Sequence, residues 1–574
     1  MKTRISKFFY LLSVFTFIIT VQFSYGQKVN YDTVKAGKFD LGKMWTFEHA
    51  PVDYFAETYN FRPSQEWLDN VRMSALKFAN YCSASFISED GLILTNHHCG
   101  RESVTKVTRQ GEDLHKTGFN SITLADERKV DSLWVEQLIK ISDVTKEVQN
   151  AIDQGKTENE KIEMKMKKVT EIEQKNAGDK KSKFEVVTLY NGAEYMLYEY
   201  RIYDDVRLVF APENDLGFFG GDPDNFTYPR YDLDCTFFRV YDDNGQPLKT
   251  SNYFKWSKGG AKEGEAIFVV GNPGSTERLN TLAQLEFKRD VLLPVYLNYI
   301  QNELDNYAKE INGDPELQKK YDDDIFSLLN SQKAFIGTLK GLNDPYLMAK
   351  KKDFEKTLKA KVEANSNLKE KYGSAWAEIE KLQNEKKIIF ASYPAMDRVK
   401  LKLINQKETY YKSLLGKAIY EVYGTSIPPD ATFTLRISDG VISSYQYNGT
   451  TAPPKTTFYG LYDRHYSFNK KYPFELPDRW LNPPPEFDLS TPMNFAATND
   501  ITGGNSGSPV ININGEIVGL AFDGNIESLP GDFIFTTESN RMICVDSEGL
   551  LEAVKDLYKA KRLSDEMENG KLVP

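Results

Sequence analysis

Two short stretches of the chain carry the residues best suited to covalent chemistry. Ser506 lies in Thr502-Gly-Gly-Asn-Ser-Gly-Ser-Pro509, and His98 lies in Leu94-Thr-Asn-His-His-Cys-Gly100. A serine among glycines on a tight turn is exposed and has backbone N–H groups around it. Acyl transfer to serine needs a base, a group that orients the base, and hydrogen-bond donors for the oxyanion. The two stretches therefore predict Ser506 as the nucleophile and His98 as its base.

The neighbours of these residues refine the assignment. The chain has five histidines, and two of them, His97 and His98, are adjacent. We prefer His98 as the base because it adjoins Cys99, whose position a disulfide would fix, and His97 would then point the other way. A structural histidine pair at a strand end is the alternative. The N–H groups of Gly504 and Ser506 form the predicted oxyanion hole, because glycines let the backbone turn inward.

The orienting carboxylate is sought between Asp222 and Asp234, where the chain has four aspartates. Asp234 directly enters a predicted strand over 235–241, where a carboxylate can be buried against an imidazole N–H. Asp232 is the rival, and all four acids also suit ordinary surface turns. Asp234 completes the predicted order His, Asp, Ser along the chain.

Cysteine spacing predicts one disulfide. Cys82 and Cys99 flank a predicted hairpin whose turn is Glu89-Asp90-Gly91, so the hairpin would bring the two cysteines together. The other pair, Cys235 and Cys544, is either a second bond or two buried thiols. No Cys/His spacing indicates zinc, and nothing in the sequence indicates a cofactor.

The N-terminus has the three parts of a signal peptide. A positive region is followed by an apolar run from Phe8 to Val21 and by the small-x-small site Ser24-Tyr25-Gly26. We therefore expect export, to the periplasm or to the cell surface, without a membrane span. The formal net charge of −10 becomes more negative once the signal cations are removed, which argues against nucleic-acid binding. The sequence leaves the oligomeric state open, and a homodimer is one of the states it allows.

Hydrophobic periodicity divides the chain into four parts. After the signal peptide (1–26), residues 27–275 are mainly strand-like, with helical spacing over about 135–175. Residues 276–425 are rich in Lys, Glu, Leu and Ala and predict an all-helical insert. Residues 426–574 return to strands, with turns expected at Asp439-Gly440 and Asn514-Gly515.

Beyond single residues, the chain resembles the bacterial dipeptidyl-peptidases of types seven and eleven, a family of chymotrypsin-clan serine exopeptidases. The motifs that carry the resemblance are Thr95–Gly100, Gly220–Arg230, Asp500–Val510 and Gly519–Asn525. The resemblance implies a mainly β fold, a chymotrypsin-like double β-barrel with an inserted α-helical cap domain. It also implies release of dipeptides from peptides with free N-termini. The helical insert is shorter than is usual in that family.

The same resemblance implies roles for residues outside the triad. Asn225 and Asp523 match positions that hold the α-ammonium of the substrate, and Phe226 and Arg230 match neighbouring positions. Gly524 stands where the acid-selective branch has an arginine, so an uncharged pocket and apolar or aromatic side chains at the penultimate (P1) residue are expected. This chain departs from the family pattern at Phe226, Tyr231 and Cys235.

Two other functions are compatible with these residues. An endopeptidase would use the same triad in an open cleft. A non-catalytic binding protein on a peptidase scaffold would use the helical insert as a docking surface. The residue types of a complete triad favour an enzyme over the second alternative.

Overall fold

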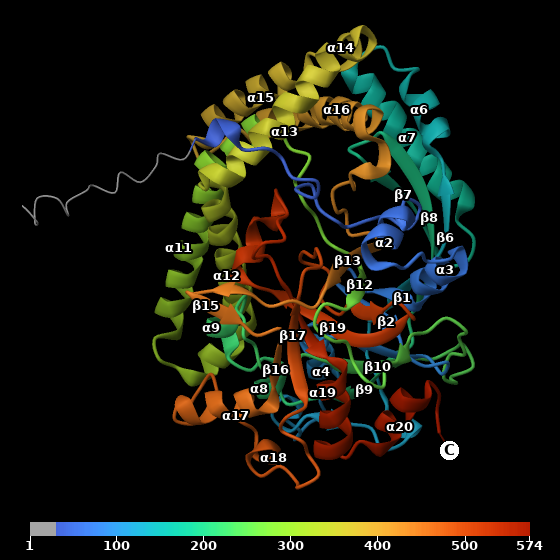
Figure 1. Ribbon diagram of the computed structural model, residues 1–574, viewed down its shortest axis with the longest axis vertical. Helices are drawn as coiled ribbons and strands as arrows, with labels where there is room; N and C mark the ends of the chain where they lie inside the picture. Colours follow the sequence, from blue (N-terminus) through green and yellow to red (C-terminus); the bar gives the residue numbers. More distant parts are fainter. Residues whose placement is uncertain (1–29, 574) are drawn as a thin grey trace, which may run out of the picture.

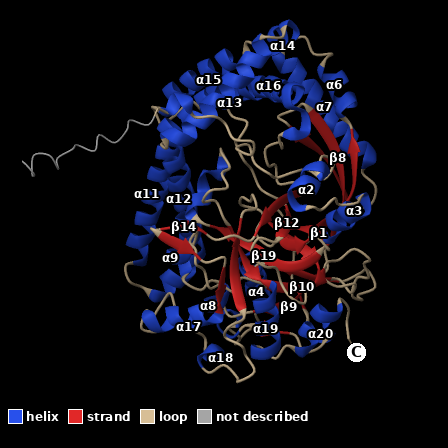
Figure 2. Ribbon diagram, viewed as in Figure 1, coloured by secondary structure: helices blue, strands red, loops and turns tan. Residues whose placement is uncertain are grey.

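The structure is a computed structural model and describes residues 30–573. The predicted signal peptide, residues 1–26, lies outside this range. The described part of the chain contains no helix with the length and apolarity that a bilayer crossing requires. Two large sheets occupy the middle of the molecule, and helices form an arc over them (Figures 1 and 2).

The first sheet belongs to the N-terminal part of the chain. Within residues 30–573 its ten strands are paired antiparallel in the order β4-β9-β10-β3-β2-β1-β6-β8-β7, with β5 also on β9. They are β1 (Ala75–Phe78), β2 (Cys82–Phe86), β3 (Leu92–Thr95), β4 (Phe119–Asn120), β5 (Arg128–Lys129), β6 (Val135–Asp143), β7 (Ser182–Leu189), β8 (Glu194–Tyr203), β9 (Val206–Ala211) and β10 (Thr236–Val240). Adjacent strands β2 and β3 form the hairpin that the sequence predicted before His98.

The second sheet combines strands from before and after the helical region. Its described strands are ordered β13-β12-β18-β19-β20-β17-β16, with β11 parallel to β19. They are β11 (Lys255–Trp256), β12 (Ala266–Gly271), β13 (Arg436–Val441), β16 (Lys455–Thr457), β17 (Pro492–Ala497), β18 (Pro509–Asn512), β19 (Glu516–Gly524) and β20 (Met542–Asp546); β14 (Tyr445–Tyr447) and β15 (Thr450–Ala452) pair separately. The hairpin predicted at Asn514-Gly515 is the β18–β19 connection.

Neither sheet is a closed barrel in the described chain. The hydrogen-bonded order of each sheet has two end strands, β4 and β7 in the first and β13 and β16 in the second. What is established is therefore a mixed α/β protein with mainly antiparallel sheets, and the expected double barrel is not confirmed. The two sheets share one apolar core, in which Leu94 and Phe237 of the first sheet join Val270 and Ile511 of the second.

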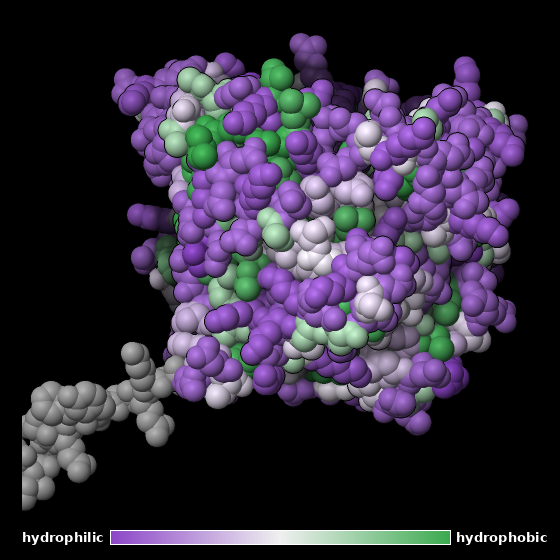
Figure 3. Space-filling model, turned by 90° about the horizontal axis from the view of Figure 1, so that it is seen from above, coloured by the Kyte–Doolittle hydropathy of each residue, from purple (hydrophilic) through white to green (hydrophobic). Residues whose placement is uncertain are grey.

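Helices fill the region where the sequence predicted a helical insert. They are α10 (Leu282–Phe287), α11 (Leu293–Ile311), α12 (Pro315–Leu342), α13 (Pro345–Glu363), α14 (Ser366–Tyr372), α15 (Ala375–Phe390) and α16 (Arg398–Tyr423), with the π-helical turn η3 (Lys288–Leu292) after α10. The boundaries 276 and 425 themselves stay predictions. The surface of the molecule seen from above is mostly hydrophilic (Figure 3). This is expected for the many lysines and glutamates of the helical region.

The other helices surround the sheets. On the N-terminal side are η1 (Tyr31–Thr33), α2 (Val52–Tyr59), α3 (Gln65–Ser74), α4 (His97–Val107), α5 (Leu114–Thr117), η2 (Leu124–Asp126), α6 (Thr145–Ile152), α7 (Glu158–Asn176), α8 (Asn214–Gly217) and α9 (Gly221–Asp224). On the C-terminal side are η4 (Gly424–Ser426), α17 (Phe458–Ser467), α18 (Asp478–Leu481), η5 (Ile526–Asp532), α19 (Ser547–Glu552), η6 (Ala553–Leu557) and α20 (Lys561–Asn569).

Helix α12 shows how local sequence sets these elements. Asp314 caps its N-terminus by accepting a hydrogen bond from the Glu316 N–H, and Pro315 occupies the first turn, where its missing N–H costs nothing. The helix ends at Leu342, shortly before Pro345 begins α13. Helix α12 is the longest of the described helices. It extends from the upper arc down beside the sheets (Figure 1).

One local prediction is correct only in part and another is wrong. The predicted helical hairpin over 135–175 is present as α6 and α7, but its first residues form the strand β6. Asp439-Gly440 is no turn, because β13 runs straight through it. The Asp439 carboxylate is buried and accepts hydrogen bonds from Lys43 Nζ at 3.0 Å and Trp45 Nε1 at 2.9 Å. A tertiary polar cluster thus overrides the turn preference of the dipeptide.

Candidate active site

A cavity of about 450 Å³ lies between the two sheets and helix α12. The first sheet and its loops contribute His98 and Asp234, and the second contributes Ser506 and Asp523. Asn330 lines the cavity from α12. His98 and Ser506 are more than 400 positions apart in the sequence, yet both face this cavity. A serine nucleophile and its base must share one space in this way.

His98 and Asp234 form a closely bonded pair. His98 lies in the first turn of α4, directly after β3, and Asp234 lies just before β10, the antiparallel neighbour of β3. One carboxylate oxygen contacts His98 Nδ1 at 2.6 Å, and the other accepts the His98 backbone N–H at 3.0 Å. The backbone bond fixes the carboxylate, and the ring bond leaves Nε2 as the nitrogen available to act as a base.

Burial and hydrogen-bond partners distinguish His98 from His97 and Asp234 from Asp232. His97 is buried, and its ring packs against Gly217. Burial lowers the pKa of His97 to about 3, so this ring stays neutral. Asp232 accepts a hydrogen bond from Arg230 at 3.2 Å, while Asp234 is the carboxylate on His98.

The charge of Asp234 also sets the protonation of His98. Removal of water from around the ring would lower the pKa of His98, but the charge and hydrogen bond of Asp234 outweigh this effect and raise it. In return, His98 keeps the pKa of Asp234 below its ordinary value, although burial alone would raise it. Asp234 therefore stays ionised and stabilises an imidazolium.

Ser506 lies on the tight turn that leads into β18. Its backbone carbonyl accepts the Ser83 N–H at 2.7 Å, and the adjacent Gly507 N–H donates to the Ala521 carbonyl at 3.0 Å. In the described chain no hydrogen bond joins Ser506 Oγ to His98 Nε2. Both side chains line the same cavity, and such contacts are commonly loose without a substrate. Ser508 is buried and its hydroxyl donates to Asn505, so it does not compete as a nucleophile.

Neighbouring hydrogen bonds orient the predicted oxyanion hole. The Gly503 carbonyl accepts the Gly274 N–H at 2.6 Å, and the Asn505 carbonyl accepts the Ser508 N–H at 2.8 Å. In a trans peptide the N–H points opposite to the carbonyl, so these bonds direct the Gly504 and Ser506 N–H groups the other way. Donors fixed in advance stabilise a developing oxyanion without reorganisation.

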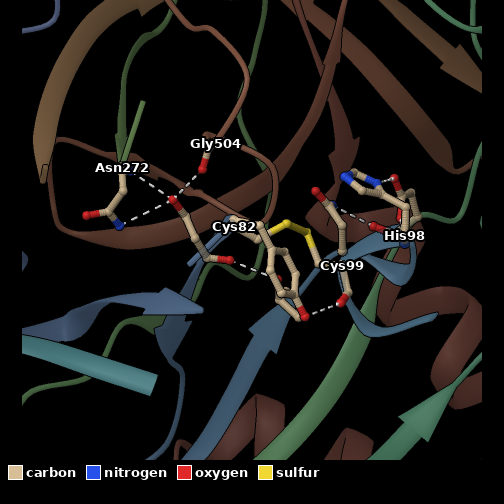
Figure 4. Close-up of a disulfide and its surroundings, with 10 residues drawn as sticks. Cys82, His98, Cys99, Asn272 and Gly504 are labelled. Atoms are coloured by element: carbon tan, nitrogen blue, oxygen red, sulfur yellow. Dashed lines mark hydrogen bonds and ion pairs between the residues drawn. A yellow bond between two sulfur atoms is a disulfide. The ribbon is translucent and has the colours of Figure 1, made fainter. Parts of the chain in front are cut away.

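Strand β2 connects the nucleophile to the base. Ser83 Oγ donates to the Gly504 carbonyl at 2.9 Å, and Asn272 N–H donates to the same hydroxyl at 2.8 Å. The preceding residue, Cys82, forms the predicted disulfide with Cys99, beside His98. In Figure 4 the disulfide lies between Gly504 and Asn272 on one side and His98 on the other.

The remaining cysteines are free thiols. Cys235 and Cys544 are both buried and unbonded, so the second bond that the sequence left open does not form. Cys82, His98 and Cys99 bring ligand atoms within 4.8 Å of one another, but both sulfurs are used in the disulfide.

One end of the cavity carries a buried charged cluster around Asp523. Its carboxylate accepts hydrogen bonds from Arg230 and, at 3.0 Å, from the Phe226 N–H. Burial raises the pKa of Asp523, and Arg230 partly opposes this. Asn225 donates to Asn330 Oδ1 at 3.0 Å, which leaves the amide oxygen of Asn225 as its acceptor. The structure thus places all four predicted ammonium-site residues together.

The surroundings of Gly524 differ from the expected uncharged pocket. A Cβ at this glycine would lie 2.4 Å from Ser528 Oγ, so a larger residue would have to displace that hydroxyl. The same cavity is also lined by Lys288 and Asp532, which form an ion pair. The cavity that Gly524 lines therefore also carries charged side chains.

Helix α12 is held differently on its two sides. On the side that faces η5, the backbone of α12 at Gly337 and Gly341 lies directly against the side chains of Leu529 and Pro530. A Cβ atom at Gly337 would lie 2.3 Å from Leu529, and one at Gly341 would lie 2.7 Å from Pro530. Toward the first sheet it makes ion pairs, Asp323 with Arg101 at 2.9 Å and Lys333 with Asp222 at 3.2 Å.

Sequence reasoning missed Asn330, Lys288 and Asp532. Asn330 and Lys288 lie in the helical region, where polar residues at regular spacing look like an ordinary solvated helix face, and Asp532 lies at the end of η5, after β19. Ser83 and Gly274 were missed as well, because their role is to bind backbone atoms of a distant loop. No local pattern marks such residues.

Comparison with known proteins places the chain in a family. The model of the family Peptidase S46 matches residues 39–405 and 392–569, and the chain belongs to this peptidase family. The "Asp/Glu-specific dipeptidyl-peptidase" of Shewanella putrefaciens is 26% identical, over 87% of this chain and 93% of that protein. "Dipeptidyl-peptidase 7" of Phocaeicola vulgatus is also 26% identical, over 85% of this chain and 90% of its own length. The crystal structure of Porphyromonas endodontalis DPP11 with the dipeptide Arg-Glu is 21% identical and has a TM-score of 0.78, covering 92% of this chain and 99% of that one, which shows a shared fold.

The raised pKa of His98 predicts the acid limit of activity. Because His98 must be neutral to accept a proton, kcat/KM should fall as pH drops through a pKa above the ordinary 6.5. Asp234→Asn removes the charge that raises this pKa, so the acid limb should move to lower pH while kcat falls by about 10⁴-fold. pH-rate profiles and NMR titration of the His98 ring measure both effects. Asp242→Asn, beyond the far end of β10, is the control, and an acid limb unmoved by Asp234→Asn would contradict the assignment.

A methyl group at Gly504 should damage the oxyanion hole. Gly504 has φ +98°, and its Cβ would lie 2.5 Å from the Asn272 carbonyl oxygen. Gly504→Ala should therefore rotate the N–H donor and lower kcat by about 10²–10³-fold with little change in KM. Gly503→Ala is the matched control, since a Cβ there would meet nothing within 4 Å. Equal kinetics for the two variants would show that the Gly504 N–H is no donor to the oxyanion.

Proposed function

We propose that this protein is an exported serine dipeptidyl-peptidase that releases dipeptides from peptides with free N-termini. The observation that carries the proposal is the position of the Asp523 cluster, in the same cavity as His98 and Ser506. The names of relatives in the same family support the reaction class.

The cluster suits the α-ammonium of a peptide. Asp523 supplies a carboxylate whose side chain is 8% exposed, and Asn225 supplies an amide oxygen and is 7% exposed; charge-assisted hydrogen bonds are strong in such surroundings. When the α-ammonium of the substrate is held there, it fixes how many substrate residues fit between the N-terminus and Ser506. An enzyme of this kind counts residues from the N-terminus instead of reading a long sequence.

The proposed catalytic steps use these residues in turn. Ser506 Oγ attacks the second peptide carbonyl and gives its proton to His98 Nε2, while Asp234 stabilises the imidazolium. The Gly504 and Ser506 N–H groups bind the oxyanion. His98 then protonates the leaving amine, which leaves a dipeptidyl ester on Ser506. Water, deprotonated by His98, hydrolyses this ester and releases the dipeptide.

Three finer features belong to the proposal. The two sheets are interpreted as the two barrels of a chymotrypsin-like peptidase, with the active site between them. The helices over 282–423 act as the cap, supported by the residues of α12 in the cavity lining. Export rests on the N-terminal sequence pattern.

The proposed P1 preference is for apolar or aromatic side chains. Gly524 places no cation beside Ser528, and apolar lining comes from Ile501, Phe522 and Leu529. Burial of one such P1 side chain contributes about 1.5–3 kcal/mol. Some relatives are named as Asp/Glu-specific, so this preference is a property proposed for this chain alone.

Product analysis of one decapeptide tests the reaction. We expect successive dipeptides from the free peptide and no cleavage when its N-terminus is acetylated, because acetylation removes the ammonium that Asp523 binds. Mass spectrometry identifies the products. Asp523→Asn should abolish nearly all of this activity.

Two controls separate the alternatives. An endopeptidase would cleave the acetylated peptide at internal sites and would lose little activity in Asp523→Asn. A non-catalytic scaffold protein would not react with a fluorophosphonate probe, whereas the proposed enzyme should be labelled at Ser506 and Ser506→Ala should not.

The P1 preference is tested with dipeptidyl substrates that differ only at the second residue. Substrates ending in Leu or Phe should have kcat/KM values at least about tenfold above those ending in Asp or Glu, the ratio that follows from about 1.4 kcal/mol of apolar burial. Fastest cleavage after Asp or Glu would refute the preference.

A further inference from the structure

The backbone carbonyl groups of the nucleophile turn, those of residues 503–506, are each held by a hydrogen bond. Backbone N–H groups of Gly274, Ser508 and Ser83 hold three of them, the carbonyls of residues 503, 505 and 506 respectively. The Gly504 carbonyl differs, because its donor in the described chain is a side chain, the Ser83 hydroxyl at 2.9 Å. A single substitution can therefore release this peptide group without removing any backbone donor.

The Ser83 hydroxyl has one acceptor for its proton. Its oxygen accepts the Asn272 backbone N–H at 2.8 Å and the Asn272 side-chain amide at 3.3 Å (Figure 4). These two bonds use both lone pairs of the hydroxyl, so its proton is left for the Gly504 carbonyl. Donors on one side of a hydroxyl also strengthen the bond that it donates on the other. Because Ser83 is fully buried, solvent does not compete for this proton.

The donor of these two bonds is itself fixed. Asn272 directly follows β12, and its side-chain amide also donates to the Leu76 carbonyl of β1 at 3.2 Å. The carbonyl of the next residue, Pro273, accepts the Phe433 N–H at 2.8 Å. Residues of β1 and β2 and the end of β12 thus meet at the Ser83 hydroxyl, so the position of the Gly504 carbonyl depends on all three strands.

The Gly504–Asn505 peptide group lies between the two predicted oxyanion donors, the N–H groups of Gly504 and Ser506. Rotation of this peptide group changes the angle between the donors, which must converge on one oxygen atom. Gly504 has φ +98° and no Cβ, so its own conformational preference does not prevent that rotation. The other edge of the peptide group makes a bond within the turn itself, from the Asn505 N–H to the Thr502 carbonyl at 3.1 Å. Ser83 therefore supplies the contact from outside the turn.

We propose that Ser83 is a positioning residue, whose hydroxyl holds the Gly504–Asn505 peptide group so that the two N–H donors converge on the oxyanion. The inference rests on the proposed serine-peptidase function and assigns Ser83 no contact with substrate. Loss of the hydroxyl should weaken stabilisation of the oxyanion. It should leave ground-state peptide binding and the pair of His98 and Asp234 unchanged.

Steady-state kinetics with Ala-Leu p-nitroanilide test this role. Ser83→Ala should lower kcat by about 10–100-fold with less than about threefold change in KM, because a misdirected oxyanion donor affects only the transition state. Ser85→Ala is the matched control. Ser85 is also in β2 and fully buried, and its hydroxyl has no hydrogen-bond partner within residues 30–573. Equal kinetics for the two variants would overturn the inference.

A second pair of variants separates the hydroxyl from packing. Ser83→Thr and Ser83→Val add side chains of nearly the same shape, and only the threonine keeps a hydroxyl. The kcat of Ser83→Thr should be at least about tenfold above that of Ser83→Val. Thermal unfolding shows which variants fold, and this pair decides the question if Ser83→Ala is unfolded. Failure of both Ser83→Ala and Ser83→Val to fold would show that the hydroxyl serves folding, and the inference would fail.

Two further measurements locate the effect in the oxyanion hole. The acid limb of the pH–rate profile should not move in Ser83→Ala, because His98 keeps its bond to Asp234. A displaced limb would show that Ser83 acts on the imidazole and would contradict the proposal. Ser83→Ala combined with Gly504→Ala should have a kcat within about threefold of Gly504→Ala alone, since both changes disable the same donors. Multiplied losses would place the effect of Ser83 elsewhere.

Labelling of Ser506 by a fluorophosphonate probe separates this inference from the proposed function. Labelling at least about tenfold slower in Ser83→Ala, without dipeptide release by the wild type from any peptide, would refute the proposed function and leave the inference intact. Dipeptide release by the wild type, with kcat and labelling of Ser83→Ala within about threefold of it, would refute the inference alone. A wild-type protein that is neither labelled nor active would overturn both.

Discussion

The active-site arrangement depends on two adjacent residues of β2. Ser83 binds the backbone of the nucleophile turn at two points, through its N–H to the Ser506 carbonyl and through its hydroxyl to the Gly504 carbonyl. Cys82 is covalently joined to Cys99, the residue after His98. One strand therefore sets the separation of base and nucleophile, although these come from different sheets. The other residues of the site act on Ser506 and His98 in the relative position that β2 fixes.

Buried charge organises the rest of the cavity. Arg230 lies between Asp523 and Asp232, and Asp234 follows two residues later with its own cationic partner, His98. Isolated buried carboxylates would become protonated, so each of these needs a nearby positive group or N–H donors. Arg230 thereby favours the ionised form of Asp523 without occupying the whole hydrogen-bonding capacity of its carboxylate. The same alternation of charges runs from the substrate end to the base.

Local contacts of the site were easier to predict from the sequence than the architecture. Ser506, His98, Asp234 and the Cys82–Cys99 bond could be found because glycines, a histidine beside a cysteine, and a hairpin have strong local signatures. The helical region was recognisable from its period and its composition. Tertiary contacts decided the rest. The Asp439-Gly440 pair stays extended because Lys43 and Trp45 bind the carboxylate, and Lys288 with Asp532 reaches the cavity only after the chain has folded.

Sheet closure could not be predicted either. Whether a set of antiparallel strands closes depends on bulges and stagger between distant strands, and alternating residues do not reveal these. The β9–β10 and β18–β19 pairs both shift register within a few residues. Such shifts bend the strands next to the cavity and are invisible in the hydrophobic pattern.

The unequal attachment of α12 has a consequence for how the cleft can open. Its packing on η5 is close, while its contacts with the loops of the first sheet include two ion pairs, in which Asp323 is 75% exposed and Lys333 is 26% exposed. Solvent-exposed ion pairs contribute about 0–1 kcal/mol each and weaken as salt rises. The helix should therefore travel with the C-terminal sheet, and the gap should widen along the edge that bears the imidazole. Ionic strength then becomes a control on which peptides can enter.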